Sequence, residues 1–151
     1  MQLTQKESGL LKDLKSQEKL CIEKYKKHAE CANDTQLKDL FGRIAQVEQQ
    51  HYDTICQMEN GTVPQFNSAS QQQKPTFKAT YGNFDDEKKK NDSYLCSDLL
   101  STEKHVAHLY DTCIFEFTDE GMRNALNHIE KEEQEHGKMI YDYMSTNKMY
   151  S

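Results

Sequence analysis

The sequence predicts an all-α protein, a four-helix bundle made of two pseudo-symmetric helical hairpins. Over four long segments, apolar residues recur at spacings of three and four, as they do on one face of a helix. Two of these segments carry a Glu-x-x-His tetrapeptide, Glu48 to His51 and Glu133 to His136. The second half of the chain also repeats the first with an offset of 85 residues. Because one hairpin cannot bury its apolar stripe alone, we expect the two hairpins to pack face to face around one core.

The repeat includes polar residues that interrupt the apolar stripes. At the offset of 85 residues, Glu18 matches Glu103 and Tyr25 matches Tyr110. Each glutamate stands where a leucine would be expected in the stripe of its helix. The same offset also matches apolar residues, including Leu14 with Leu99, Ile44 with Ile129 and Ile55 with Ile140. We therefore expect a pseudo-two-fold axis that brings both sets of polar residues to the middle of the core.

Length and charge limit the class of protein. A chain of 151 residues, 35% hydrophobic and 29% charged, has the size of one ordinary domain (residues 1–151). The net charge is −6, and lysines and arginines are interspersed with acids, which argues against nucleic acid or an anionic membrane surface as a partner. No apolar run is long enough to span a membrane, and no signal-peptide pattern follows Met1. We expect synthesis in the cytoplasm.

The five cysteines include no Cys-x-x-Cys pair, so neither a rubredoxin-type iron site nor a zinc ribbon can be built. We interpret them as small core residues, the alternative being crosslinking of an exposed cysteine. They are Cys21, Cys31, Cys56, Cys96 and Cys113.

The first hairpin is predicted over residues 4–59. Thr4 and Glu7 have the spacing of a capping box, which indicates the start of the first helix. A short turn follows, and either Asn33 or Asp34 caps the second helix.

The segment from about 60 to 85 is rich in polar residues and contains both prolines. It is too long to join neighbouring antiparallel helices, so we expect a crossover along the bundle. Four aromatic residues are expected to attach it to the helices: Phe66, Phe77, Tyr81 and Phe84.

The second hairpin is predicted over residues 86–146. Its first helix is expected to begin between Asp85 and Asp92, because acids favour a helix N-terminus. Lysines 88 to 90 are interpreted as a solvated face. A short turn at Thr118 and Asp119 precedes the last helix.

Four carboxylates that converge in an apolar core would be strongly destabilising as bare anions. Two divalent cations match their charge, and two neutral imidazoles complete the coordination. One Glu from each of two helices, with Glu-x-x-His from each of the other two, is the ligand set of di-iron and di-manganese carboxylate bundles. The predicted cofactor is two metal ions, with iron favoured and manganese as the alternative. The candidate ligands are Glu18, Glu48, His51, Glu103, Glu133 and His136.

The repeat also suggests a role for each ligand. Glu48 and Glu133 are expected to bridge the two ions, with Glu18 and His51 on one ion and the remaining pair on the other. A bundle whose centre holds only protons and water is the alternative. Tyr25 and Tyr110 either donate hydrogen bonds to the ligands or simply fill the core. Four histidines have no partner in the repeat and are expected at the surface: His28, His105, His108 and His128.

The ligand set makes the chain look like a member of the ferritin-like superfamily, and further wording resembles the coat F family of bacterial spore coat proteins. The segments that carry this resemblance are residues 14–25, 44–51, 99–105 and 125–137. The resemblance implies a small ferritin-like bundle, made in the mother cell of an endospore former and associated with the spore coat. Other coat proteins are then expected partners, and we expect a homodimer or small oligomer.

Three functions follow from this resemblance. The first is a coat-associated di-metal protein that contributes to oxidative-stress protection. The second is a di-metal oxidoreductase that consumes peroxide or oxygen, or oxidises ferrous ion. Rubrerythrins, which are more distantly similar, carry an extra carboxylate at the position of Leu100, so their peroxidase chemistry does not transfer directly. The third is a metal-free structural coat protein.

Overall fold

The computed structural model describes residues 1–66, 73–83 and 86–150. In this part of the chain there are four long helices and no strand, so the predicted all-α four-helix bundle is confirmed. The helices are α1 (Gln5–Cys31), α2 (Thr35–Glu59), α3 (Glu87–Ile114) and α4 (Glu120–Thr146).

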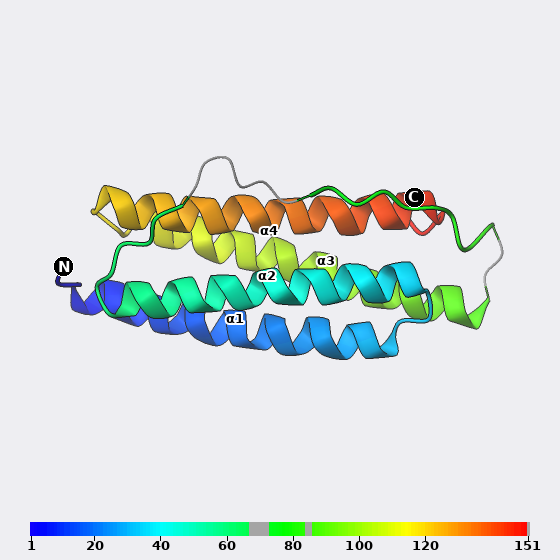
Figure 1. Ribbon diagram of the computed structural model, residues 1–151, viewed down its shortest axis with the longest axis horizontal. Coiled ribbons are helices and arrows are strands. Elements are labelled where there is room, and N and C mark those ends of the chain that lie inside the picture. The colour runs from blue at the N-terminus through cyan, green and yellow to red at the C-terminus, as the bar shows by residue number, and fades with distance from the viewer. Residues whose placement is uncertain (67–72, 84–85, 151) are drawn as a thin grey trace.

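Helices that correspond to each other in the repeat pack side by side. Within each hairpin α1 packs on α2 and α3 on α4, and the hairpins meet through α1 with α3 and α2 with α4. In Figure 1, α1 and α4 run in one direction and α2 and α3 in the other, so all packed neighbours are antiparallel. The two Glu-x-x-His helices, α2 and α4, are therefore adjacent, and so are the two helices that contribute a single glutamate.

Helix caps explain where the helices begin. The Glu7 amide donates to Thr4 Oγ1 at 3.0 Å and the Thr4 amide donates to Glu7 Oε1 at 2.9 Å, which is the predicted capping box. Asp34, Asp86 and Asp119 cap α2, α3 and α4 with their carboxylates. A cap of this kind contributes about 1 kcal/mol to helix stability.

The described parts of the crossover from α2 to α3, residues 60–66 and 73–83, reach α4 at two places along the bundle (Figure 1). Phe66 stacks on His128 with ring centroids 4.1 Å apart, and Phe77 meets Tyr143 edge-on at 5.4 Å. Tyr81 donates its hydroxyl to Asp92 at 2.8 Å. These aromatics attach the crossover as expected, whereas Phe84 lies outside the described residues.

Asp92 joins three parts of the chain at one end of the bundle. Its carboxylate is fully buried and accepts from the Asn33 and Asp34 amides at 2.8 and 3.0 Å and from the Tyr81 hydroxyl. Tyr143 of α4 donates to Asp34 at 2.7 Å. This junction fixes the α1–α2 turn against the start of α3.

The lysine run at the start of α3 differs from the prediction. Lys89 is buried, and its ammonium group donates to the Gly82 carbonyl at 2.8 Å. The crossover passes directly before α3 and covers one side of it, so one of the three lysines is enclosed and satisfies a backbone acceptor. The interpretation of the whole run as a solvated face was therefore wrong for Lys89.

The cysteines divide by position. Cys21, Cys96 and Cys113 are buried, as expected for small core residues. Cys56 is half-buried and Cys31 is exposed, so the core interpretation is wrong for Cys31. Cys31 is the last residue of α1, where the helix leaves the core.

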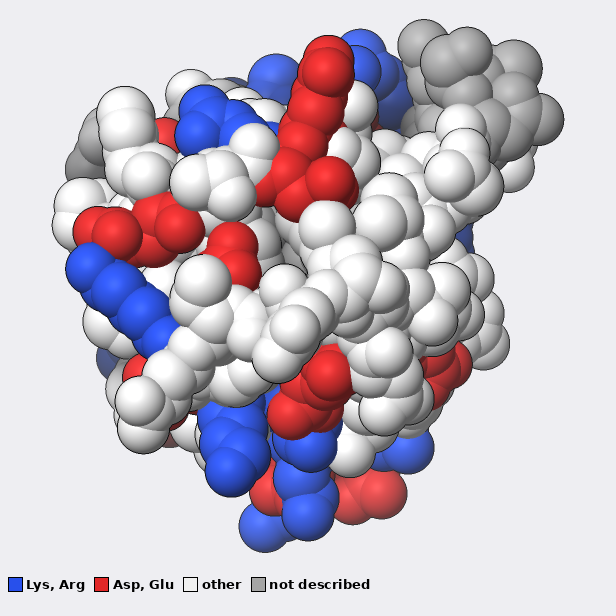
Figure 2. All heavy atoms as spheres, turned by 90° about the vertical axis from the view of Figure 1, so that its left-hand side faces the viewer, with Lys and Arg blue, Asp and Glu red and all other residues white. Residues whose placement is uncertain are grey.

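The outer surface carries both charges. Figure 2 shows the end of the bundle at which the N-terminus lies, where acidic and basic side chains are interspersed instead of forming a patch of one sign. Among the described helices, none has an apolar stretch sufficient for crossing a membrane.

Candidate metal centre

The bundle core contains two apolar clusters separated by a polar centre. One cluster gathers residues of α1, α2, α3 and α4 around Phe41 and Tyr143, and the other does so around Ile55 and Phe117. Between them the structure brings together all six candidate ligands, none with a relative exposure above 2%. We call these residues the central cluster: Glu18, Glu48, His51, Glu103, Glu133 and His136.

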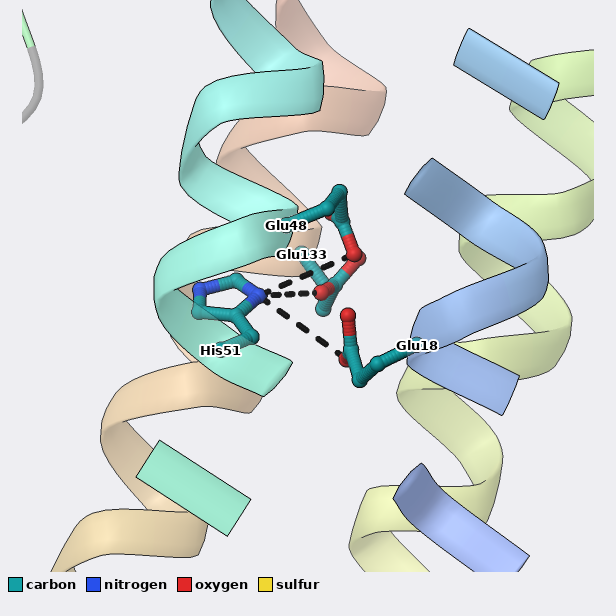
Figure 3. A group of neighbouring side chains, drawn as sticks. All are labelled: Glu18, Glu48, His51 and Glu133. Carbon is teal, nitrogen blue, oxygen red and sulfur yellow. Dashed lines mark hydrogen bonds and ion pairs between the residues drawn. The ribbon is translucent and has the colours of Figure 1, made fainter. Parts of the chain in front are cut away.

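The first half of the central cluster consists of Glu18, Glu48, His51 and Glu133 (Figure 3). One ligand atom from each lies within 4.8 Å of the others. His51 Nδ1 is 2.7 Å from Glu133 Oε1, 3.8 Å from Glu48 Oε2 and 3.9 Å from Glu18 Oε1. Three carboxylates from three helices thus face one imidazole nitrogen.

The second half consists of Glu48, Glu103, Glu133 and His136, again with ligand atoms within 4.8 Å of one another. His136 Nδ1 is 3.0 Å from Glu48 Oε1, 3.6 Å from Glu103 Oε1 and 3.8 Å from Glu133 Oε2. Glu48 and Glu133 belong to both halves.

Many polar atoms of the central cluster have no hydrogen-bond partner. Among the described residues, the buried side-chain oxygen and nitrogen atoms without a partner all belong to this cluster. They are Glu18 Oε2, both oxygens of Glu48, Glu103 Oε2, Glu133 Oε2 and both ring nitrogens of His136. His136 Nδ1 lies close to Glu48 Oε1, but without the alignment that a hydrogen bond requires. A buried polar group without a partner costs about 1 to 3 kcal/mol, so such a concentration points to a ligand.

Burial and mutual repulsion shift the ionisation of the central cluster. Burial, followed by the charges of Glu48 and Glu133, raises the pKa of Glu18 well above its usual value, and the pKa of Glu103 rises for the same reasons. Burial acts to raise the pKa of Glu48 too, but the close approach of Glu18 and of the two histidines outweighs burial and holds this pKa well below its usual value. Without metal, the cluster therefore keeps protons on some carboxyl groups and leaves Glu48 ionised.

The two imidazoles also favour protonation in the absence of metal. Burial acts to lower the pKa of His51, but its hydrogen bonds to Glu132 and Glu133 raise this pKa well above the usual value. The pKa of His136 is raised as well, chiefly by the charge of Glu103 against the opposing effect of burial. Protons and metal ions thus compete for the same atoms.

Tyr25 and Tyr110 each form a hydrogen bond from one hairpin to the other. Tyr25 of α1 donates to Glu103 of α3 at 2.5 Å, and Tyr110 of α3 donates to Glu18 of α1 at 2.6 Å. Both tyrosines are fully buried, so they fill the core and bind the candidate ligands at the same time. Each tyrosine donates to the glutamate of the other hairpin, and the repeat alone did not identify this pairing.

Glu132 is a site residue that sequence reasoning missed. Its Oε1 lies 2.9 Å from His51 Nε2, on the side of the ring opposite the central cluster, and 3.3 Å from His128 Nε2. The signal in the sequence is a break in the repeat, because Val47 occupies the equivalent position. His128 is consequently half-buried and not a simple surface histidine.

The remaining histidines fall into two groups. His105 and His108 are exposed, as predicted. His28 is half-buried and lies 2.8 Å from Asp98 Oδ2, so it forms a contact between α1 and α3 away from the central cluster.

Comparison with known families bears on the second hairpin. Residues 91–151, which include Glu103, Glu133 and His136, match the family model described as the Coat F domain. The match covers 61 of the 151 residues. The resemblance to the coat F family is thereby confirmed, and the observed bundle is consistent with the ferritin-like superfamily. No curated protein and no solved structure matches the chain. The matched segment supplies three of the six residues of the central cluster, and the first hairpin supplies the other three.

Proposed function

We propose that this protein binds two divalent metal ions, iron or manganese, in the middle of its helical bundle and that it is associated with the spore coat. The observation that carries the metal proposal is the set of buried atoms without partners: five carboxylate oxygens and two imidazole nitrogens within one cluster. Oxygen-rich sites with few nitrogen ligands suit iron and manganese better than zinc, which favours thiolates.

The residues fit such a pair of ions. Glu18 and His51 would hold one ion, Glu103 and His136 the other, and Glu48 and Glu133 would bridge them. Four carboxylates balance the charge of two divalent ions. The hydroxyl groups of Tyr25 and Tyr110 orient the terminal carboxylates, which leaves the second oxygen of Glu18 and of Glu103 free to act as a ligand.

The match to the Coat F domain over residues 91–151 supports the proposed association with the spore coat, because that family is named for the spore coat. The fold does not specify a reaction. We therefore propose metal binding as the primary function, with a contribution to protection of the spore against oxidants as its expected consequence.

The test is metal analysis of the loaded protein. After anaerobic incubation with ferrous or manganous ion and removal of free metal, we expect about two ions per chain. The double variant Glu48→Ala with Glu133→Ala should bind neither ion with comparable affinity. If the wild-type protein retained no stoichiometric metal, or if the double variant bound as much as the wild type, the proposal would be wrong.

Redox catalysis is a second candidate function, and one observation favours it. A surface pocket of about 350 Å³ lies between α3 and α4 and is lined by both Glu103 and Glu133, so a small molecule could approach the centre from outside. Bound iron or manganese would pass electrons to peroxide or oxygen, and a second peroxide molecule or ferrous ion from solution would return them to the centre. Repeated turnover of peroxide that is lost in His51→Ala would support catalysis, whereas a single stoichiometric oxidation would favour metal binding alone.

A further inference from the structure

We propose that the two metal positions are inequivalent: the position of Glu18 and His51 retains its ion, and the position of Glu103 and His136 exchanges it. This inference rests on the proposed function and adds a specific role for Glu132, a positioning residue that the repeat does not duplicate. Three independent features of the structure support it.

The first feature is the partner of His51. Its Nδ1 faces the central cluster and its Nε2 lies 2.9 Å from Glu132 Oε1, so both ring nitrogens are fixed. A carboxylate behind a ligating histidine sets the tautomer and the orientation of the ring and raises the basicity of the ligating nitrogen. Glu132 is only 16% exposed, which limits competition from water for this contact. The His51 ring is thus preorganised to bind a metal ion through Nδ1.

The second feature is the absence of such a partner for His136. Its Nε2 is buried and has no hydrogen-bond partner among the described residues. The repeat position that corresponds to Glu132 is Val47 on α2, which offers neither a donor nor an acceptor. The Nε2 side of the His136 ring therefore has no polar partner, and the ligating nitrogen lacks the added basicity that Glu132 gives to His51.

The third feature is the pocket between α3 and α4. It is lined by the buried residues Glu103 and Glu133 and by the exposed residues Lys104 and Lys138. Gly137 also lines it, one residue after His136, and a side chain there would narrow the opening. Glu18 and His51, by contrast, do not line this pocket. Solvent and small solutes therefore reach the Glu103 position first.

The experiment is a stepwise titration of the metal-free full-length protein with manganous ion. Calorimetry gives the affinity of each step, and electron paramagnetic resonance distinguishes a single ion from a coupled pair. We expect two steps of one ion each, with the first dissociation constant at least tenfold below the second. His51→Ala should remove the tight step, and His136→Ala should remove the weak one.

Glu132 variants test the cause of the difference. Glu132→Val copies the side chain of the equivalent position 47 and should weaken the tight step by about 10- to 100-fold, with the weak step nearly unchanged. Glu132→Gln keeps an acceptor for His51 but removes the charge, so it should weaken the tight step less than Glu132→Val does. Glu135→Val is the matched control, because it removes the same charge from a half-buried position on α4. Circular dichroism establishes that each variant folds. If Glu132→Val does not fold, the affinity of the tight step in Glu132→Gln tests the role of Glu132.

A release experiment tests the pocket. When a chelator is added to the loaded protein, one ion should leave quickly and the other slowly, and Gly137→Leu should slow only the fast phase. Release of both ions at one rate, or an unchanged fast phase in Gly137→Leu, would overturn the exchange assignment.

The outcomes separate this inference from the proposed function. Two ions bound with one common affinity, or equal weakening of both steps by Glu132→Val, would overturn the inequivalence and leave the metal centre intact. A failure to bind two ions at all would overturn the proposed function itself.

Discussion

Metal should reverse the pH dependence of stability, and this prediction tests the central cluster as a whole. Between pH 5 and pH 7, the groups of the cluster with strongly raised pKa values are Glu18, Glu103, His51 and His136. In this range the folded metal-free protein holds more protons on these groups than the unfolded chain does. Stability rises with pH only where the unfolded state binds more protons, so the metal-free protein should become less stable from pH 5 to pH 7. Glu48, whose pKa is lowered, is ionised throughout this range and changes stability only at lower pH.

Metal-bound protein should behave in the opposite way, because binding requires ionised carboxylates and neutral imidazoles. At pH 7, a hundredfold excess of free metal over its dissociation constant adds about 2.7 kcal/mol per ion. In a chain of this size 1 kcal/mol corresponds to roughly 2 to 4 °C, so one ion raises Tm by about 5 to 11 °C. Each proton that must be displaced throughout the range costs about 1.4 kcal/mol per pH unit, or about 2.7 kcal/mol over two units. One such proton is enough to cancel the stabilisation at pH 5.

The assay is thermal unfolding followed by circular dichroism, anaerobically, with and without a fixed concentration of manganous ion at pH 5, 6 and 7. The expected result is a Tm that falls with pH without metal and rises with pH in its presence. The double variant Glu48→Ala with Glu133→Ala serves as the control and should show no metal-induced shift. An equal metal-induced rise in Tm at pH 5 and pH 7 would refute the reasoning, because it would place the ions on the acidic surface.

Three further predictions concern the groups around the centre and at the ends of the helices. Tyr110→Phe leaves Glu18 without its buried donor and should cost about 1 to 3 kcal/mol in urea unfolding of the metal-free protein, while Tyr94→Phe, at an exposed position, should cost nothing measurable. Asp92→Ala removes the acceptor of the Asn33 and Asp34 amides and of the Tyr81 hydroxyl, and it should cost about 3 kcal/mol or more by the same measurement, against no loss for the exposed Asp39→Ala. Thr4→Ala breaks the capping box and should lower the free energy of unfolding by about 1 kcal/mol, with Thr4→Ser restoring most of it. In each case, equal stability of the variant and its control would contradict the assigned contact.

Local signals made the helices predictable from the sequence. Caps such as Thr4 and Asp119 depend on residues a few positions apart, and the apolar stripes depend on spacing within one helix. The convergence of the six candidate ligands was also predictable. The repeat gives both hairpins the same three ligands at the same positions, so packing the hairpins face to face brings both sets to the centre.

Contacts between helices were less accessible to sequence reasoning. The repeat relates Tyr25 to Tyr110 but does not say which glutamate each one reaches, because that depends on the packing of α1 against α3. Glu132 lies beside the apolar stripe of α4 and reaches His51 only because α4 packs against α2. Lys89 could not be told from its two neighbours, because the path of the crossover decides which lysine is enclosed.

The break in the repeat at Glu132 and Val47 has a consequence for what a duplicated chain can do. A single hairpin that paired with an identical copy would present every residue twice, so a carboxylate behind one histidine would also stand behind the other. Joining the two hairpins through the crossover removes this constraint, because each copy can change by itself. Symmetry supplies the ligands of the centre in pairs, and covalent linkage allows their surroundings to differ. A two-chain assembly of identical hairpins could not gain a difference between its two halves by substitution alone.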